Sequence, residues 1–312
     1  GHIVTEEDIP VLLSVGKENL YIWEKQEGML HENEAAEILR QICQGEHMHP
    51  SEVKEGKIEL IADCEGVLKI NTEKLNAVNN LGEMMIASRH GNFPVKTGDK
   101  IAGTRIIPLV IEEEKMQKAC EVAGKEPIFR ILPYQKKKAG IVTTGSEVYY
   151  HRIEDKFTPV VIEKLKECGV TEVKQIQCND DHEMIMEAIQ TLIEDGSDLI
   201  VCTGGMSVDP DDRTPLAIKN ACTEVVTYGA PVLPGAMFML AYCEKEGRQI
   251  PVMGLPGCVM YAKRTIFDLV LPRIMCDEKL HEKDFRLLGQ GGLCLSCPVC
   301  TFPNCGFGKG GY

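Results

Sequence analysis

The run LIVCTGGMSVDPDDRTP, from Leu199 to Pro215, decides the fold class of this chain. Its apolar opening, LIVCT, is typical of a strand that is buried on both faces of a parallel sheet. Gly204 and Gly205 then allow positive φ angles and a close approach of the backbone to a ligand. Thr214 as N-cap and Pro215 at the first helical position predict a helix. This order indicates an α/β fold, in which ligands bind beyond the carboxyl ends of the strands.

The same alternation of strands and helices extends on both sides of this run. Short connections between them predict a parallel sheet covered by helices on both faces, over residues 139–276. Asp180 or Asp181 is the expected N-cap of the second helix. The other predicted strands are Ala139–Thr143, Val173–Gln177, Val225–Thr227, Met237–Cys243 and Ile250–Met253, and the other predicted helices are Phe157–Cys168, followed by Gly169, His182–Glu194 and Val259–Ile274.

Residues 1–138 lack this rhythm and are expected to form a preceding α+β domain. Lys57–Ile61 and Gly66–Ile70 predict a hairpin that turns at Asp63–Glu65. The run Lys136–Lys138 is typical of a solvated linker and marks the expected boundary, and residues 277–312 form a C-terminal segment. The remaining predicted elements are the helices Asn33–Cys43, Thr72–Leu81 and Glu112–Ala123 and the strands Met84–Ala87 and Ile128–Leu132.

The composition excludes several kinds of partner. Thirty-four basic and 47 acidic residues give a net charge of −13, which disfavours nucleic acid because its phosphate backbone needs a basic surface. No apolar run reaches the length of about 18 residues that a membrane span requires. The sequence opens without a signal peptide, so a cytoplasmic location is expected. The 14 cysteines are then expected to be reduced thiols or metal ligands rather than disulfides.

Small and acidic side chains follow the predicted strands. TTGSE, Thr143–Glu147, offers hydroxyls and a glycine that let backbone N–H groups approach an anion, although a plain tight turn has the same composition. Asp209, Asp211 and Asp212 fall within four residues, and their mutual repulsion must be offset by a cation or by hydrogen bonds. Mg²⁺ favours such oxygen ligands. The alternative is an acidic, solvated loop.

Two further strand ends belong to the same edge of the sheet. Cys178-Asn179-Asp180-Asp181 follows the second strand and adds carboxylates there, unless these only cap the next helix. Gly254-Leu255-Pro256-Gly257 ends the last strand, either as a rigid turn or as a part of the site. Together the strand ends predict one polar site for an anionic ligand.

These motifs resemble a known family. TTGSE at Thr143–Glu147, NDD at Asn179–Asp181, TGGMSVDPDDRTP at Thr203–Pro215 and GLPG at Gly254–Gly257 occur in the order and spacing of the molybdopterin-binding domain of molybdenum-cofactor biosynthesis proteins. That family includes molybdopterin adenylyltransferase, molybdopterin molybdotransferase and the competence-damage-inducible protein. The resemblance covers Ala139–Ile274, a little under half of the chain.

The resemblance implies an α/β domain that binds molybdopterin, with or without an adenylyl group, by its phosphate and dithiolene end. It implies catalytic roles for Asp212 and for Asp181 or its neighbour Asp180, with Mg²⁺ held by Asp212 and Asp181. It also implies a homo-oligomer, either a dimer or a trimer. The cofactor-binding residues implied by the motifs are Thr143, Thr144, Gly145, Ser146, Glu147, Gly204, Gly205, Ser207, Pro256 and Gly257.

A large domain before the motifs is similar to the molybdotransferase, which inserts molybdate into adenylylated molybdopterin. Partners implied by this are a pterin phosphate, molybdate, and a molybdoenzyme or another biosynthesis protein. The chain departs from that pattern in three places: Pro234–Met237 lacks the basic residue of a PGKP-like element, Cys258-Val259 follows GLPG in place of Asn-Pro, and Gly1–Trp23 is similar to a segment that normally lies directly before TTGSE. The alternatives are a non-catalytic carrier or sensor of the cofactor, and a nucleotide pyrophosphatase of the competence-damage type.

Four cysteines crowd the C-terminal end. Cys294, Cys297, Cys300 and Cys305 have the spacing C-x2-C-x2-C-x4-C, which is near the bacterial iron–sulfur run C-x2-C-x2-C-x3-C. Four thiolates also suit a structural Zn²⁺. Either metal would organise a glycine-rich tail that has few apolar residues to fold around. The alternative is a reduced tail without metal.

Overall fold

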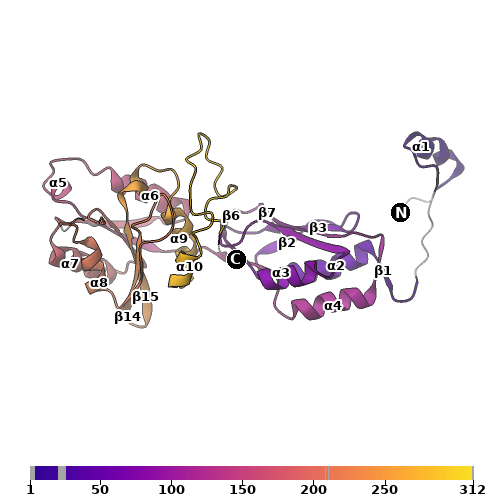
Figure 1. Cartoon of the computed structure of the whole chain (residues 1–312), viewed down its shortest axis with the longest axis horizontal. Coiled ribbons are helices and arrows are strands. Elements are labelled where there is room, and N and C mark those ends of the chain that lie inside the picture. The colour runs from indigo at the N-terminus through magenta and orange to yellow at the C-terminus, as the bar shows by residue number, and fades with distance from the viewer. Residues whose placement is uncertain (1–3, 20–25, 208, 210, 311–312) are drawn as a thin grey trace.

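The computed structural model describes residues 4–19, 26–207, 209 and 211–310 (Figure 1). The predicted segment Gly1–Trp23 therefore lies partly outside the described residues, as do Val208 and Pro210 of the acidic loop. The described chain forms an N-terminal and a C-terminal body, each with its own hydrophobic core. No helix among the described residues combines the length and the apolar character needed to span a membrane.

The C-terminal body is built on a six-stranded sheet, in the order β11-β10-β12-β15-β14-β13. The first four strands in this order are parallel, and β14 and β13 extend the sheet in antiparallel fashion. The predicted α/β class is confirmed, with an antiparallel edge added. The strands are β10 (Lys138–Thr143), β11 (Glu172–Gln177), β12 (Leu199–Thr203), β13 (Glu224–Tyr228), β14 (Met239–Lys245) and β15 (Arg248–Leu255).

Helices cover both faces of this sheet (Figure 1). In β10, Ile141 packs into the core beneath α6 and α9, and Val142 packs into the core beneath α7 and α8. Alternate residues of one buried strand thus serve two helical layers, which explains its uninterrupted apolar sequence. The helices are α5 (Ser146–Tyr149), α6 (Phe157–Glu167), α7 (His182–Glu194), α8 (Thr214–Ala221), α9 (Ile266–Met275) and α10 (Glu282–Arg286).

The predicted single helix Val259–Ile274 is wrong. The chain forms a short 3₁₀ helix, η2 (Gly257–Met260), and then α9, which starts at Ile266. Thr265 and Asp268 form a capping box that fixes the start of α9, with the Thr265 backbone N–H donating to Asp268 Oδ2 at 2.7 Å. The predicted cap of α8 also shifts by one residue, because Thr214 is the first helical residue and its hydroxyl bonds to Thr144 instead.

The N-terminal body packs helices on a four-stranded antiparallel sheet, ordered β2-β3-β7-β5, beside a three-stranded sheet, β6-β4-β9. The strands are β2 (Met48–Pro50), β3 (Lys57–Ala62), β4 (Gly66–Ile70), β5 (Met84–Ser88), β6 (Pro94–Val95), β7 (Lys100–Ile106) and β9 (Phe129–Pro133), and the helices are α2 (Glu32–Cys43), α3 (Thr72–Asn79) and α4 (Glu113–Ala123). A small pair, β1 (Met29–His31) and β8 (Val110–Glu112), lies at one end, and η1 (Glu6–Asp8) and α1 (Ile9–Ser14) precede it in the chain.

The predicted hairpin in this body is wrong, although both of its strands exist. β3 pairs with β2 and β7, whereas β4 belongs to the other sheet and pairs with β6 and β9. The Asp63 backbone N–H donates to His47 O, and the Tyr134 backbone N–H donates to Glu65 O. The turn therefore carries the chain from one sheet to the next.

The two bodies meet where β9 leads into β10. The Gln135 backbone N–H donates to Met275 O at 2.8 Å, and Lys69 of β4 pairs with Glu278, just after α9, at 2.8 Å. Arg273 pairs with the same carboxylate at 2.6 Å. Burial alone would raise the pKa of Glu278, but the hydrogen bond from Arg273 and the charge of Lys69 outweigh it and lower that pKa. A charged cluster thus links the bodies.

The C-terminal segment folds back over the C-terminal body. Leu293 forms a parallel bridge with Leu233, and Phe307 is buried in the core that α6 and α9 share. A Cβ on Gly308 would lie 2.4 Å from Leu269, so this residue can pass so close to α9 only because it is glycine. The segment is therefore fixed at both of its ends.

Candidate functional site

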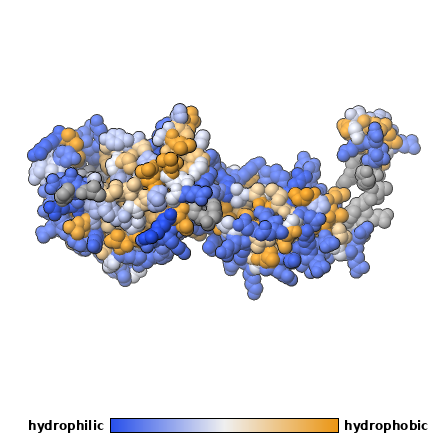
Figure 2. All heavy atoms as spheres, viewed as in Figure 1, coloured by the Kyte–Doolittle hydropathy of each residue, from blue (hydrophilic) through white to orange (hydrophobic). Residues whose placement is uncertain are grey.

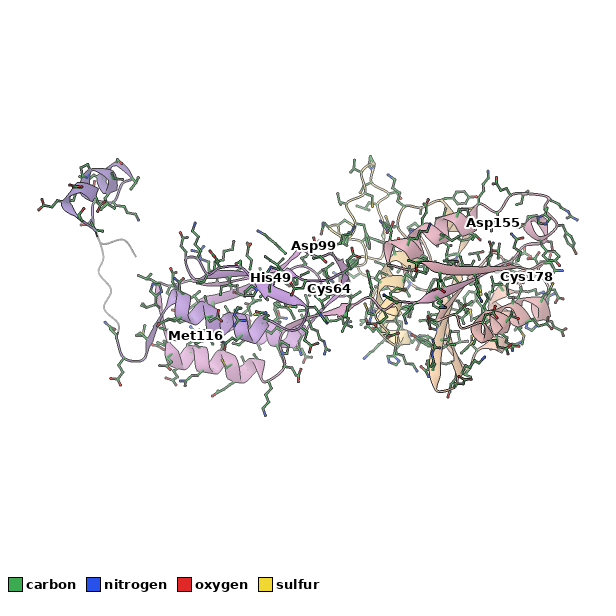
Figure 3. The ribbon with its side chains drawn as sticks, turned by 180° about the vertical axis from the view of Figure 1, so that it is seen from behind. His49, Cys64, Asp99, Met116, Asp155 and Cys178 are labelled. Atoms are coloured by element: carbon green, nitrogen blue, oxygen red, sulfur yellow. The ribbon has the colours of Figure 1, made fainter. Side chains whose placement is uncertain are left out.

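The carboxyl ends of the parallel strands meet at one level. Thr143 of β10 is in register with Gln177 of β11 on one side and with Thr203 of β12 on the other. Thr203 is in turn in register with Leu255 of β15. The loops that follow these residues are the ones that carry the motifs. They lie at the end of the C-terminal sheet that faces away from the N-terminal body, where Asp155 and Cys178 are labelled in Figure 3.

The TTGSE loop is tied to the strand beside it. The Thr144 backbone N–H donates to Thr203 O at 2.8 Å, and the Thr144 hydroxyl donates to the same oxygen at 3.1 Å. That hydroxyl also lies 3.1 Å from the hydroxyl of Thr214, at the start of α8. Gly145 then turns the chain with φ at +128° and leads into α5. Three segments distant in sequence are thus held together around two buried threonines.

Gly204 and Gly205 form a cradle that only glycine can make. Both have positive φ, at +87° and +54°. A Cβ on Gly204 would lie 2.4 Å from Thr144 O, and one on Gly205 would lie 2.8 Å from Thr214 Oγ1. Both residues remain partly exposed. The backbone of this turn can therefore approach an anion directly, without a side chain in between.

Replacing Gly204 with alanine is expected to lower the free energy of unfolding by about 1–3 kcal/mol, because a non-glycine residue is strained at this φ. The clash with Thr144 O adds to this strain and displaces the TTGSE loop. Gly196→Ala is a matched control, since Gly196 has a φ of +86° with no atom within 4 Å of the added Cβ. Chemical denaturation measures both variants. Equal losses in the two would show that the contact with Thr144 costs nothing.

Asp212 organises the loop after the glycines. Its Oδ2 accepts a hydrogen bond from the Ser207 backbone N–H at 2.7 Å, across the turn. Tyr228 of β13 closes the other side, where its hydroxyl donates to Met206 O at 3.1 Å. Burial raises the pKa of Tyr228, and the nearby Asp212 carboxylate raises it further. Asp209, in contrast, is exposed, and its side chain accepts only within the loop, from the Asp211 backbone N–H at 3.1 Å.

The two aspartates after β11 have different surroundings. Asp180 Oδ2 accepts from the Ser146 backbone N–H at 2.8 Å, which joins this loop to the start of α5. Asp181 is exposed and caps α7, with its Oδ1 accepting from the Met184 backbone N–H at 3.0 Å. The structure thus places Asp180 against the TTGSE loop and engages Asp181 as a helix cap.

The GLPG turn packs beside the glycine loop. A Cβ on Gly254 would lie 2.5 Å from the Met206 side chain, so this glycine makes room for the residue after the cradle. Pro256 is buried, and its carbonyl accepts from the Val259 backbone N–H at 3.0 Å, whereas Gly257 is exposed. Glu147 is exposed on α5, with its carboxylate 3.1 Å from the position of a Cβ on Gly145.

A polar network that the motifs did not indicate lies below Thr143. Asp155 Oδ1 accepts from the Phe157 and Thr158 backbone N–H groups at 2.9 and 3.0 Å, which caps α6. Gln175 Nε2 donates to Asp155, to Thr158 and to Thr143 at 2.9–3.1 Å. Burial alone would raise the pKa of Asp155, but these hydrogen bonds, that of Thr158 foremost, lower it. The signal in the sequence was an aspartate before an apolar helical run.

Thr203 differs from its neighbours in the site. It is 1% exposed, and its hydroxyl has no hydrogen-bond partner among the residues that the structure describes. A buried hydroxyl without a partner carries a desolvation cost of about 1–3 kcal/mol. The hydroxyl of Thr203, the last residue of β12, is thus available to donate and accept a hydrogen bond directly before the glycine cradle.

Within residues 4–19, 26–207, 209 and 211–310, no three side chains of His, Cys, Asp or Glu converge as the ligands of a metal would. The aspartates of the site bind backbone N–H groups instead. The four tail cysteines are not brought together either, but all four line one cavity on another face of the body.

Two family models and several curated proteins match parts of the chain. A family described as probable molybdopterin binding domain matches residues 140–275, and a domain of unknown function matches residues 1–24. A CinA-like protein of Mycobacterium sp. (strain MCS) is 35% identical over 85 residues, and one of Mycobacterium avium (strain 104) is 34% identical over 95 residues. The matched parts cover 27% and 30% of this chain but only 20% and 22% of those proteins.

Solved structures are similar to part of the chain. The tungsten cofactor synthesizing protein MoaB of Pyrococcus furiosus is 22% identical, with a TM-score of 0.35, and the match covers 40% of this chain and 84% of that protein. A molybdopterin biosynthesis protein of Mycobacterium abscessus is 18% identical, with a TM-score of 0.37, over 45% of this chain and 92% of that protein.

Proposed function

Because residues 140–275 belong to the molybdopterin-binding superfamily that includes CinA-like proteins, we propose that this chain binds molybdopterin or its adenylylated form in molybdenum-cofactor biosynthesis. The main support for the proposal is the cradle of Gly204 and Gly205. A Cβ on either residue would clash with its neighbours, so only a glycine backbone fits there. The residue directly before the cradle, Thr203, has a buried hydroxyl without a hydrogen-bond partner in the described part of the chain. Both features fit the phosphate end of a pterin, because a phosphate offers acceptor oxygens to backbone N–H groups.

Binding at this site would depend on positioning and charge neutralisation. The backbone N–H groups of the cradle and the Thr203 hydroxyl would hold the phosphate. Asp212 would supply a carboxylate oxygen to Mg²⁺ that enters with the phosphate, since Mg²⁺ is commonly held by one or two carboxylates plus substrate phosphates. Such a shared site is consistent with side chains that do not converge on a metal by themselves. Asp180 would keep the TTGSE loop in place through Ser146.

We propose metal insertion, with release of AMP, as the activity of the bound state. A carrier that binds without turnover is the second candidate, and one observation favours it. The element Pro234–Met237 carries no basic residue, and a Cβ on Gly235 would lie 2.5 Å from Ile266, so the turn packs tightly against the start of α9. A cation that would assist the leaving group is absent from this element. A nucleotide pyrophosphatase remains the third candidate.

The assignment also includes proposals about the setting of the protein. We propose that molybdate and a molybdoenzyme or biosynthesis protein are its partners and that it forms a dimer or a trimer. We also propose a cytoplasmic location, in which the 14 cysteines would be reduced.

The test is equilibrium binding of adenylylated molybdopterin to the full chain, followed by assay of AMP release on addition of molybdate and Mg²⁺. Binding with molybdate-dependent release of AMP would support the insertion activity. Binding without release would identify a carrier. If the chain binds the pterin no better than Gly204→Ala does, the proposed site is wrong.

Thr203→Val gives the same experiment a second readout. Valine has the shape of threonine without the unpaired hydroxyl, so the free energy of unfolding is expected to rise by about 1 kcal/mol. Pterin binding is expected to weaken, because the hydroxyl that would bind the phosphate is gone. Thr143→Val is the matched control, since that hydroxyl bonds to Thr158 and Gln175 and its loss should destabilise the protein. A destabilised Thr203→Val would show that the hydroxyl has a partner without ligand.

A further inference from the structure

The four tail cysteines line a single cavity of about 530 Å³. Its other wall is the connection Tyr261–Arg264, between η2 and α9, and Phe302 and Phe307 close its inner side. Cys297 and Cys300 are exposed, and Cys294 and Cys305 are partly buried. The four cysteines that are closely spaced in the sequence therefore also line the same cavity in the fold.

The loop that carries these thiols is closed at its base. The Cys294 backbone N–H donates to Leu233 O at 2.8 Å, and the Gly308 backbone N–H donates to Gly291 O at 2.9 Å. Phe307 anchors the far end in the core. The loop is therefore anchored at its ends, and residues 294–300 between these anchors are not held in a helix or a strand.

Large apolar side chains around the cavity are exposed to solvent. Tyr261, Leu295 and Val299 are 82%, 78% and 76% exposed, and this part of the surface is hydrophobic in Figure 2. Exposed apolar surface of this kind is typical of a site that a ligand or partner covers.

Positive charge also lies at the cavity. Lys263 Nζ donates to Pro298 O at 3.0 Å, on the loop itself, and the Arg264 guanidinium lies 5.2 Å from the centre of the Phe302 ring. Positive charge at the wall would offset the negative charge of a centre that four thiolates bind. Thiolates are the form in which cysteine binds a metal. The wall of the cavity is thus suited to a negatively charged thiolate centre.

We propose that Cys294, Cys297, Cys300 and Cys305 bind an iron–sulfur cluster. Structural zinc sites usually take their cysteines as two pairs from separate segments, whereas three cysteines at consecutive steps of three residues are typical of cluster-binding runs. Four thiols give up four protons as they bind, and two ferrous ions, two ferric ions and four sulfides supply the rest of a four-iron cluster, so no electron is transferred. The inference goes beyond pterin binding and does not depend on it.

The test uses the full chain, purified without oxygen and reconstituted with equal amounts of ferrous and ferric iron and with sulfide. We expect about four iron and four sulfide per chain, with a visible charge-transfer absorption, if the cluster is of the four-iron type. Cys297→Ser and Cys300→Ser should each lose most of the bound iron. Cys120→Ser, which changes an exposed thiol on α4 in the other body, should bind as the unmodified chain does.

Unaltered thermal unfolding of the two serine variants without metal would show that their loss of iron is not misfolding, because both side chains are exposed. Zinc as the only metal bound would overturn the cluster, and so would iron bound equally by all variants or by none. Failure of pterin binding would leave these results unchanged, so the two proposals can fail separately.

Discussion

Asp212→Ala is expected to abolish pterin binding and any AMP release, by at least about 100-fold, while the protein stays folded. Asp212 fixes Ser207 by accepting from its backbone N–H at 2.7 Å, so its loss frees the loop that follows the glycine cradle. It also removes the carboxylate proposed to hold Mg²⁺ beside the phosphate. The residue is only partly buried, and α8 does not use its side chain as a cap.

The measurement is equilibrium binding of adenylylated molybdopterin, with circular dichroism and thermal unfolding as the check on the fold. Asp195→Ala is the matched control, since Asp195 is exposed at the end of α7 and pairs only with the exposed Lys174. It should bind the pterin normally. An Asp212→Ala variant that binds and turns over the pterin like the unmodified chain would remove Asp212 from the site.

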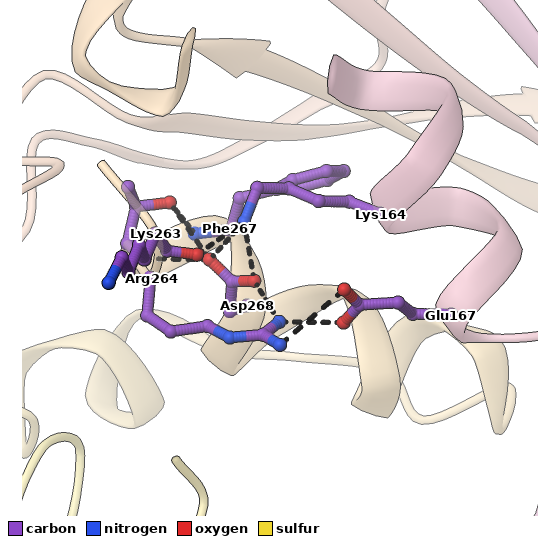
Figure 4. A network of polar contacts seen from close by, with 7 residues as sticks. Lys164, Glu167, Lys263, Arg264, Phe267 and Asp268 are labelled. Carbon is purple, nitrogen blue, oxygen red and sulfur yellow. Dashed lines mark hydrogen bonds and ion pairs between the residues drawn. The ribbon is translucent and has the colours of Figure 1, made fainter. Parts of the chain in front are cut away.

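Asp268→Ala is expected to lower the free energy of unfolding by about 3–5 kcal/mol, the cost of leaving a buried charge unpaired. Asp268 accepts from Lys164 Nζ at 2.7 and 2.9 Å and from Arg264 at 2.8 Å (Figure 4). The side chains of Lys164 and Asp268 are 8% and 3% exposed. The same carboxylate caps α9 through Thr265, so its removal also leaves a helix end unsatisfied.

Chemical denaturation measures this loss, and two further variants locate its cause. Glu167→Ala removes only the exposed partner of Arg264 and should cost about 0.5 kcal/mol. The double variant Lys164→Met with Asp268→Ala should recover part of the loss, because no charge then stays buried without a partner. A loss below about 1 kcal/mol in Asp268→Ala would show that Lys164 finds water or another acceptor.

Some parts of the fold could be predicted because a single segment determines them. β10 and β12 are buried on both faces, so each is an uninterrupted apolar run whatever its neighbours are. The turns after them need glycine and small hydroxyls for reasons that are visible in the sequence. The contacts that a Cβ on Gly204 or Gly205 would make are too close, which is the physical cause of that composition.

Other parts depend on pairing that no single segment reveals. β3 and β4 look the same whether they pair with each other or with distant strands, so the hairpin was predicted from the turn alone. The break before α9 was hidden by apolar residues on both sides of it, although the Thr265 and Asp268 capping box marks it. The role of Gln175 exists only because β11 lies beside β10.

The sequence predicts which loops lie at the candidate site, but it does not predict the contacts of the individual side chains on those loops. The sequence placed Asp180 and Asp181 together, but only the structure separates the one that supports Ser146 from the one that caps α7. Either aspartate satisfies the composition of a helix start. Which of them points to the TTGSE loop depends on the register of β10 and β11.

The C-terminal segment does more than cover the C-terminal body. Phe93, from the N-terminal body, packs in the same core as Phe307, and its ring lies 5.8 Å from that of Phe302. Arg89 donates to Asn304 at 2.9 Å, and Lys309 Nζ lies 5.6 Å from the centre of the Phe93 ring. The C-terminal segment therefore connects the wall of the cysteine cavity to the N-terminal body, and a rearrangement at the thiols would reach that body without passing through the glycine cradle.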